Sequence, residues 1–261
     1  MKILTVGDVV GDCGLEFLRI ELPKIIKSHN INFTIVNGEN ALPGSGINSA
    51  ACDVIFNAGC DCITLGNHAF SKKDVEKAFI KYPKTLIRPL NYDGSLDGEG
   101  YTILDVNGYR IGIINLIGRI YLLNVNCPFL AADKAIDYMK SKNIDMIMVD
   151  FHAEATSEKK AMGYYLDGRA SAVFGTHTHT PTADEQILPE KTGFITDIGM
   201  TGSQDSILGL KKEISINKIV HHKNARYDWA DKDPALMGAI FEIDENTGNC
   251  LSVERIKVAS H

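Results

Sequence analysis

Residues 2–8 read KILTVGD, a short apolar run that ends in an acid, and this design recurs twice further along the chain. FTIVNGEN at 33–40 and CITLGNH at 62–68 are also apolar runs that end in polar residues. Such runs are typical of buried strands. The segments at 14–28 and 48–59 between them have apolar residues at helical spacing. This strand–helix alternation predicts a layered α/β fold of β-sheets flanked by helices.

The rest of the chain extends this pattern without a linker, repeat or low-complexity block, so residues 1–261 are predicted to form one domain. Pro23 is expected to bend or break the first helix. The Gly-containing stretches at 42–48 and 200–209 are expected to be mobile or to face the substrate. The further predicted elements are a helix at 72–82, a hairpin at 101–116 with an Asn-Gly turn, a helix at 132–143, strands at 144–152 and 170–179, and a hairpin at 235–258.

Composition excludes several classes of protein. The net charge of −6 argues against a general nucleic-acid-binding surface, because phosphate contacts need clustered Lys and Arg. No apolar run approaches the length of a membrane span, and the N-terminus lacks the features of a signal peptide. A cytoplasmic protein with six reduced thiols is therefore expected. Cys60 and Cys62 are expected to point to the same face of an extended segment.

Polar side chains stand at the end of each of five predicted strands. Because ligands of open α/β sheets bind at the carboxyl ends of strands, these side chains are expected to meet. Carboxylates, amides and imidazoles together suit Mn, Fe, Zn or Ni. His177 and His179, two residues apart in VFGTHTHTP (173–181), can supply one ligand to each of two neighbouring metals. The full set is Asp8, Glu39, Asn40, Asn67, His68, His152, His177 and His179.

In the order of these residues the chain resembles the calcineurin-like metallophosphoesterase superfamily. The segments GENALPGSGI (38–47), DGRASAVFGTHTHTPTADEQILP (167–189) and TDIGMTGSQDSILG (196–209) resemble its bacterial YmdB-type branch. The resemblance runs from residue 1 to about residue 258. It implies a metallophosphoesterase-like sandwich and a cytoplasmic two-metal phosphodiesterase acting on small cyclic nucleotides such as 2′,3′-cyclic AMP. It also implies a homo-oligomer that forms no stable complex with nucleic acid or membrane.

The resemblance further implies a role for each site residue. Glu39 would bridge two cations, which are expected to be iron or manganese, with zinc as an alternative. The cations would share a hydroxide nucleophile. His68 would not bind metal but would act as an acid or stabilise the phosphoryl charge. One cation would take Asp8, Glu39, Asn40 and His179, and the other Glu39, Asn67, His152 and His177.

Four positions depart from the superfamily pattern. Val10 stands where a histidine ligand is usual, Glu39 replaces the bridging Asp, and Ala69 follows Gly-Asn-His in place of an acid. These three fit the YmdB-type branch. Ser203 stands where that branch is expected to carry proline, which bears on the shape of the loop at 200–209.

Several alternatives stay open at this point. The same site would suit a phosphomonoesterase or nucleotidase, since specificity depends on loops, and a regulatory protein could hold metal and nucleotide without turnover. Glu154 and Asp184 are candidates for orienting the ligand histidines. Tyr164, Arg169 and Thr178 are weaker candidates for lining the substrate pocket.

Overall fold

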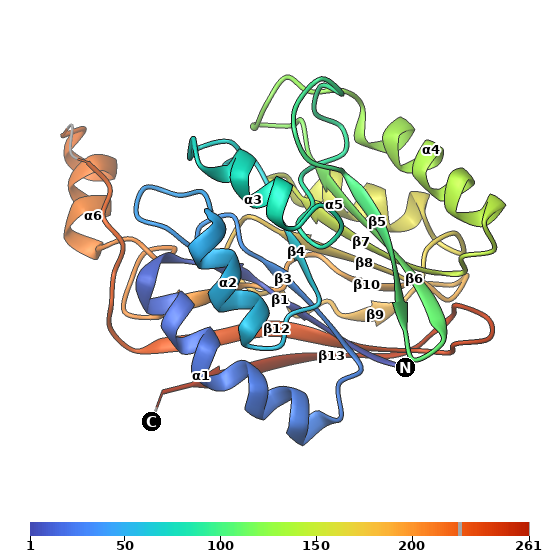
Figure 1. Cartoon of the computed structure of the whole chain (residues 1–261). Coiled ribbons are helices and arrows are strands. Elements are labelled where there is room, and N and C mark those ends of the chain that lie inside the picture. Colours follow the sequence, from blue (N-terminus) through green and yellow to red (C-terminus); the bar gives the residue numbers. More distant parts are fainter. Residues whose placement is uncertain (224–225, 261) are drawn as a thin grey trace.

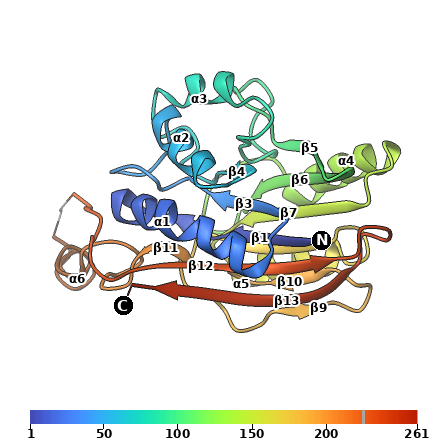
Figure 2. The same ribbon diagram turned by 60° about the horizontal axis from the view of Figure 1, so that its bottom comes forward.

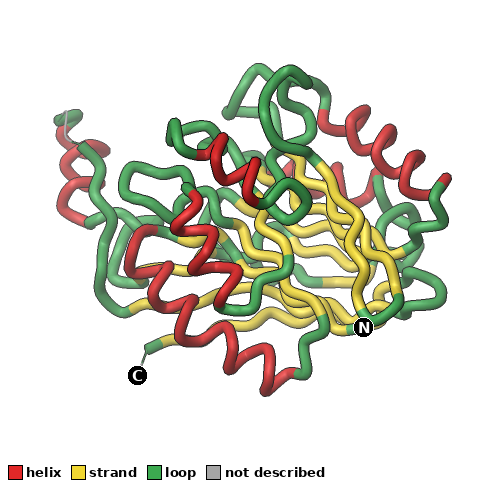
Figure 3. Tube along the Cα trace, viewed as in Figure 1, coloured by secondary structure: helices red, strands yellow, loops and turns green. Residues whose placement is uncertain are grey.

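The computed structural model describes residues 1–223 and 226–260, in which two β-sheets pack face to face between helices (Figure 3). The first sheet has the strand order β2-β11-β12-β1-β3-β4, with β13 paired to β12. Its strands are β1 (Lys2–Val6), β2 (Asp8–Val9), β3 (Phe33–Asn37), β4 (Cys62–Thr64), β11 (Met200–Ser203), β12 (Pro234–Ile243) and β13 (Cys250–Ala259). The layered α/β sandwich that the sequence predicts is confirmed.

The second sheet has the strand order β5-β6-β7-β8-β10-β9. Its strands are β5 (Tyr101–Val106), β6 (Tyr109–Ile117), β7 (Met146–His152), β8 (Ala172–Thr176), β9 (Gln186–Ile187) and β10 (Gly193–Ile195). The predicted hairpin is β5–β6, and its turn residues Asn107 and Gly108 both have positive φ, as the Asn-Gly turn requires. The predicted C-terminal hairpin is β12–β13.

Helices cover the outer face of each sheet. Figures 1 and 2 show α1 (Gly11–His29), α2 (Ser49–Asn57) and α3 (Val75–Lys81) on the side of the first sheet. The helices α4 (Pro128–Ser141) and α5 (Thr156–Tyr165) pack against the second sheet. The helix α6 (Lys212–His221) stands away from the body of the molecule at the left of Figure 1.

Three apolar clusters hold these four layers together. One buries Leu18 and Ile55 of α1 and α2 against the first sheet. Another buries Ile136 of α4 and Met162 of α5 against the second sheet. The third lies between the sheets, where Ile3, Phe33, Ile35, Ile111, Met148, Phe174 and Phe241 are all buried. Burial of apolar area at all three levels is the main force that fixes the sheets relative to each other.

Parallel pairing places the ends of the key strands at common edges. In the first sheet β1 pairs parallel with β3, and β3 with β4. In the second sheet β6, β7 and β8 are parallel in the same way. The carboxyl ends of β1, β3 and β4 therefore share one edge of the first sheet, and those of β7 and β8 share one edge of the second.

The first helix differs from its prediction. It begins at Gly11 and continues through Pro23 without a break. Pro23 is exposed, while Leu22 and Ile25 on either side of it are buried against the sheet. The packing of these neighbours outweighs the backbone hydrogen bond that proline cannot donate.

Four short elements have no counterpart in the prediction: α5, β9, β10 and α6. The region 200–209 is also partly regular, because β11 forms its first part and pairs with β2 and β12. Helix α5 has the sequence TSEKKAMGYY and carries a weak apolar stripe, since Glu158 and Lys159 occupy buried positions. Its hydrophobic periodicity is therefore too weak to find.

All six cysteines are free thiols, as expected. The prediction that Cys60 and Cys62 share a face is wrong. Cys60 packs in the cluster under the helices of the first sheet, whereas Cys62 lies in the core between the sheets. Among the described residues, no helix combines the length and the apolar character needed to cross a bilayer.

Candidate metal centre

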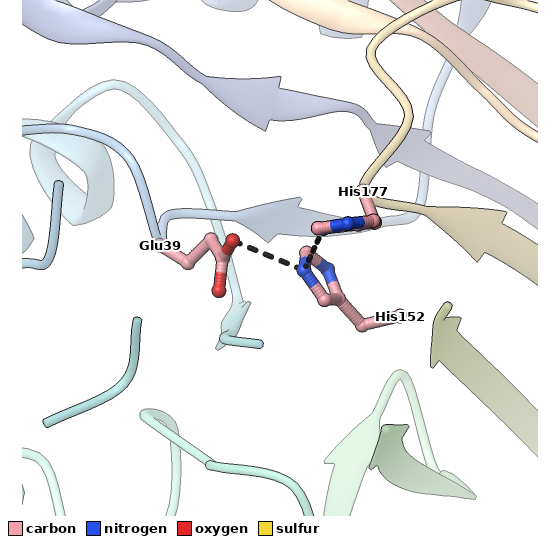
Figure 4. Close-up of side chains that lie close together, drawn as sticks. All are labelled: Glu39, His152 and His177. Carbon is pink, nitrogen blue, oxygen red and sulfur yellow. Dashed lines mark hydrogen bonds and ion pairs between the residues drawn. The ribbon is translucent and has the colours of Figure 1, made fainter. Parts of the chain in front are cut away.

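His152, the last residue of β7, is the centre of a cluster to which both sheets contribute (Figure 4). Its Nε2 atom lies 3.0 Å from Glu39 Oε1, 3.0 Å from Asn67 Oδ1 and 3.0 Å from His177 Nδ1. Glu39 follows β3 and Asn67 follows β4, while His177 follows β8. A single N–H can satisfy only one of three acceptors well, so this crowding is typical of ligands that surround a cation.

A second group of side chains adjoins the first through Glu39. The Asn40 amide donates hydrogen bonds of 3.3 Å to Glu39 Oε1 and 3.3 Å to His179 Nε2. The other Glu39 oxygen, Oε2, accepts from the His68 backbone at 3.0 Å. Glu39 thus lies between the two groups that the sequence assigns to separate cations.

Asp8 completes the arrangement at the end of β1. Its Oδ2 accepts a 3.0 Å hydrogen bond from the His177 backbone. Its Oδ1 is fully buried, accepts no hydrogen bond from the described residues, and has an ion-pair contact of 3.7 Å with His152 Nδ1. A buried carboxylate oxygen that accepts no hydrogen bond is costly unless a cation meets it. The donor set therefore fits metal ions on an observation independent of sequence.

Each of the three imidazoles presents an unprotonated nitrogen to this cluster. The other ring nitrogen of His177 lies 3.0 Å from Glu154 Oε2, and that of His179 lies 3.0 Å from the Leu208 carbonyl. Carboxylate and carbonyl oxygens can only accept, so the proton of each neutral ring is held on that outer nitrogen. His177 Nδ1 and His179 Nε2 consequently offer lone pairs inward.

The proton on His152 is fixed by residues that the sequence analysis missed. His152 Nδ1 lies 2.9 Å from the Thr176 hydroxyl, and that hydroxyl donates to Asp150 Oδ1 at 2.7 Å. Since Thr176 donates to Asp150, it accepts from His152, which leaves His152 Nε2 as the inward lone pair. Asp150 is fully buried, and burial raises its pKa to about 6. The sequence holds one sign of this role, because Asp150 is an acid inside the mostly apolar segment IDMIMVDFH (144–152).

Electrostatics agree with a site built for positive charge. Burial opposes ionisation of Glu39, but His152 and the hydrogen bonds to His152 and His68 lower the Glu39 pKa to about 2. Burial and the neighbouring His152 lower the pKa of His177 to about 3. Burial acts against the charged form of His152, yet Glu39 and Asp8 outweigh it and raise the His152 pKa to about 9. Without a metal, a proton on His152 compensates the buried carboxylates.

A buried ion pair holds the segment that carries His177 and His179. Both histidines have positive φ, 98° and 60°, which is costly for residues with a Cβ. Between them, the Thr178 hydroxyl donates 2.6 Å to Asp197 Oδ2, and its backbone N–H donates 3.2 Å to the same oxygen. Lys159 donates to that oxygen at 2.6 Å, and Lys159 and Asp197 are both buried. Neither Lys159 nor Asp197 stood out in the sequence.

The chain approaches the centre closely at Gly66, the first residue of GNH. A Cβ there would lie 2.3 Å from Glu39 Oε2 and 2.3 Å from His152 Nε2. No side chain fits, so the glycine allows the loop after β4 to bring Asn67 and His68 to the site.

A pocket of about 410 Å³ opens over this centre. His68 lines it, and its Nδ1 lies 3.3 Å from the Ser71 hydroxyl; among the described residues no hydrogen bond or ion pair joins the ring to an acidic side chain. The His68 side chain bonds to none of the other candidate residues. The remaining lining residues are Glu39, Asn40, Ser45, Glu154, His177, Thr178, His179, Thr180, Leu208, Leu210 and Trp229.

Of the candidates for supporting the ligands or lining the pocket, some lie at the site and others do not. Glu154 contacts His177 as expected, and Thr178 lines the pocket. Asp184 contacts no ligand histidine; it accepts from Thr182 and Thr196 and so braces the chain behind the site. The remaining two, Tyr164 and Arg169, are not among the pocket residues, and Arg169 instead pairs with Asp133.

Two of the departures from the superfamily pattern have visible structural roles. Val10 is buried, and its backbone bridges to Asn40, so the backbone of the residue that replaces the usual histidine adjoins the proposed substitute ligand. Ser203 is buried at the end of β11, where its hydroxyl donates to the Lys232 carbonyl. The serine therefore joins a regular strand to the segment before β12.

The chain is similar to known proteins over nearly its whole length. A family model described as YmdB-like protein matches residues 4–256. The 2′,3′-cyclic-nucleotide 2′-phosphodiesterase of Bacillus subtilis (strain 168) is 43% identical over 258 residues, covering 99% of this chain and 97% of that protein. The crystal structure of a Mycoplasma pneumoniae phosphatase superposes with a TM-score of 0.92 at 33% identity, covering 99% and 93% of the two chains.

A more distant structure shares the fold alone. The 5′-nucleotidase precursor of Thermus thermophilus has a TM-score of 0.60 at 14% identity, and the match covers 99% of this chain and 54% of that one.

Proposed function

The chain belongs to the family of YmdB-like proteins, and from this premise we propose that it is a metal-dependent phosphodiesterase for small cyclic nucleotides such as 2′,3′-cyclic AMP. The protein is a phosphoric ester hydrolase. One observation carries the metal dependence: three acceptor atoms converge on His152 Nε2, while the buried Asp8 Oδ1 accepts no hydrogen bond from the described residues. The acceptor atoms that meet here have too few N–H and O–H donors to satisfy their lone pairs, which favours a bound cation.

We assign the proposed ligands to two groups that share Glu39, as the family resemblance implies. One cation takes Glu39, Asn67, His152 and His177, and the other takes Asp8, Glu39, Asn40 and His179. When bound, two such cations lower the pKa of a water to generate the nucleophile and offset charge on the phosphoryl oxygens. Iron or manganese, with zinc as an alternative, stays the prediction for their identity, and the homo-oligomer also stays a prediction.

The chain's own residues prepare the site for this chemistry. Glu154, Thr176 and the Leu208 carbonyl hold the ring protons of the three histidines away from the centre. His68 lines the same pocket without bonding to the ligand side chains. We assign it to the substrate phosphate, where it donates a proton to the leaving oxygen or stabilises phosphoryl charge.

The test is hydrolysis of 2′,3′-cyclic AMP by chelator-treated protein before and after Mn²⁺ is added back, with bound metal measured in the same samples. We expect turnover only in the metal-loaded protein, with about two metals per chain. Full activity without metal would refute the proposal, and so would an inactive protein that has rebound two metals.

A phosphomonoesterase is the second candidate, because the Mycoplasma pneumoniae relative is described as a phosphatase. Cations held by the proposed ligands could activate a water against a diester or a monoester alike. The ratio of kcat/KM on a chromogenic phosphodiester and on its monoester separates the two. A ratio well below one assigns the chain to monoesters.

A further inference from the structure

We propose that Leu208, Leu210 and Trp229 form a binding surface for the base of the nucleotide, here called the apolar wall. This inference rests on the proposed function, which gives the pocket a phosphoester substrate. The pocket lining divides by chemistry. Most of its residues are polar and include the candidate ligands, whereas these three side chains are apolar and come from the segment 207–230.

The apolar wall adjoins the candidate metal ligands directly. The Leu208 carbonyl accepts from His179 Nδ1 at 3.0 Å, so the residue that orients one imidazole also lines the pocket. A phosphate held at the imidazoles would place its organic substituent within a few ångströms of this surface. The substituent of a 2′,3′-cyclic nucleotide is a nucleoside, whose planar base is the apolar part.

Leu208 has an unusual conformation for its residue type. Its φ is 54°, in the left-handed region that bulky residues rarely adopt, and its side chain is 49% exposed. The left-handed backbone is costly, and the exposed part of the side chain provides no packing to offset that cost. If a flat base covered Leu208, the exposed apolar surface of its side chain would be buried, and this burial is favourable.

Trp229 is held rigidly before any ligand arrives. Its Nε1 donates to the Leu42 carbonyl at 3.0 Å, and its ring lies on Gly11, where an added Cβ would be 2.9 Å from the indole. Because the indole N–H already has a partner, the ring offers a ligand only apolar carbon. Aromatic rings that are fixed in this way suit stacking or edge contacts with bases.

Backbone pairing joins the two segments that carry the three side chains. Leu210 bridges to both Ile207 and Trp229, and the Ala230 N–H donates to the Gly209 carbonyl at 2.8 Å. Gly209 has a φ of 87°, and a Cβ there would lie 2.5 Å from Val10 Cγ1. The apolar wall is therefore part of the ordered scaffold.

Trp229 is the only tryptophan of the chain, so its fluorescence reports on the apolar wall directly. We would titrate adenosine, and separately ribose 5-phosphate, into protein reconstituted with zinc, which does not quench indole. Adenosine should quench the emission saturably, and ribose 5-phosphate should not. No change with adenosine overturns the inference, whatever the hydrolysis assays show.

Kinetics of Leu210→Ala give the second measurement, because Leu210 lines the pocket and, unlike Leu208, orients no candidate ligand. Leu130→Ala, at a leucine outside this pocket, is the control. The Leu210→Ala variant should lose about tenfold to a hundredfold in kcat/KM on 2′,3′-cyclic AMP, the range of a base contact. It should keep its rate on glycerol 1,2-cyclic phosphate, which has no base. An equal loss on both substrates would refute the apolar wall and leave the proposed function intact.

The experiments also recognise the case in which the proposed function fails and the apolar wall holds. If the wild-type protein binds its metals and hydrolyses neither ester, the proposed function fails. Saturable quenching by adenosine in that same protein would still support the apolar wall, which then belongs to a nucleotide-binding protein without turnover.

Discussion

At the scale of single residues, the centre depends on which atom of each side chain is free. His152, His177 and His179 all turn one nitrogen inward because Thr176, Glu154 and the Leu208 carbonyl take the proton of the other. The sequence supplied the histidines, but the acceptors come from other elements. The rings of His177 and His179 are therefore prepared to bind a cation before it arrives, whereas His152 must first release the proton that it carries in the metal-free protein.

Replacing His68 separates chemistry from metal binding. We expect His68→Ala to keep its metals, because the His68 side chain bonds only to Ser71, while turnover falls by about a hundredfold or more. Metal analysis and kcat on 2′,3′-cyclic AMP check this. His221→Ala, at an exposed position of α6, is the control and should behave as wild type. Loss of metal from His68→Ala would make His68 a ligand.

Gly66→Ala should weaken metal binding without unfolding the protein. The added Cβ would overlap Glu39 Oε2 and His152 Nε2, each 2.3 Å away, so both side chains must move. We expect metal affinity to fall by about tenfold or more, as when groups that orient metal ligands are removed. Isothermal titration with Mn²⁺ measures it. Gly94→Ala, where nothing lies within 4 Å, should bind as wild type.

At the scale of elements, α5 supports the site although its residues carry no ligand. Its Lys159 reaches Asp197, which in turn holds Thr178 between two candidate ligands with positive φ. The buried Glu158 of the same helix accepts from the backbone of Arg119 and Ile120 after β6. Buried charges of this kind weaken the helical pattern, yet they fix the loop that carries Thr178 and the loop after β6.

Asp197→Asn should destabilise the protein by about 3 kcal/mol or more, because it leaves the buried Lys159 charge without a partner. Adding Lys159→Met should recover part of that loss, since the orphaned charge is removed. Urea unfolding measures both. The exposed pair Lys77–Asp74 gives the control, and Asp74→Asn should change stability by well under about 1 kcal/mol. Additive losses in the double variant would mean that the pair is not coupled.

At the scale of the whole molecule, residues far apart in the chain form one sheet. β1 lies between β3 and β12, so residues 2–6 pair with residues 238–242 near the other end of the chain. The two sheets share a buried apolar core. Removing either half of the chain would expose that core, which supports the prediction of one domain.

A single domain should unfold in one cooperative transition. We expect the urea midpoint from Trp229 fluorescence to coincide with that from far-ultraviolet circular dichroism. The first reports on the segment 207–230, and the second on both sheets. Two separated midpoints would divide the chain into independent folding units.

The stability of the metal-free protein should depend on the charge of His152. The His152 pKa is raised from 6.5 to about 9 in the folded protein, so its contribution is complete below pH 6.5 and is lost as the pH rises through 9. Thermal melts of chelator-treated protein should therefore show a melting temperature several degrees lower at pH 9 than at pH 6.5. His152→Gln should flatten that slope, and an unchanged slope would contradict this account.

The sequence by itself determined the strand–helix alternation, both hairpins and the residue types at the strand ends. These features are local, since apolar periodicity, turn residues and strand-terminal polar groups can be read within a few positions. Asp8, Glu39, Asn67, His152 and His177 could be selected in this way because each directly follows or ends an apolar run.

Only the tertiary structure decided how those residues meet. The first sheet brings Asp8, Glu39, Asn40 and Asn67, the second brings the three histidines, and no local pattern says that the two sheets face each other in this register. The supporting residues were hidden for the same reason. Asp150, Lys159, Asp197 and Trp229 act through partners 19 to 187 positions away, and contacts of that kind exist only after the chain has packed.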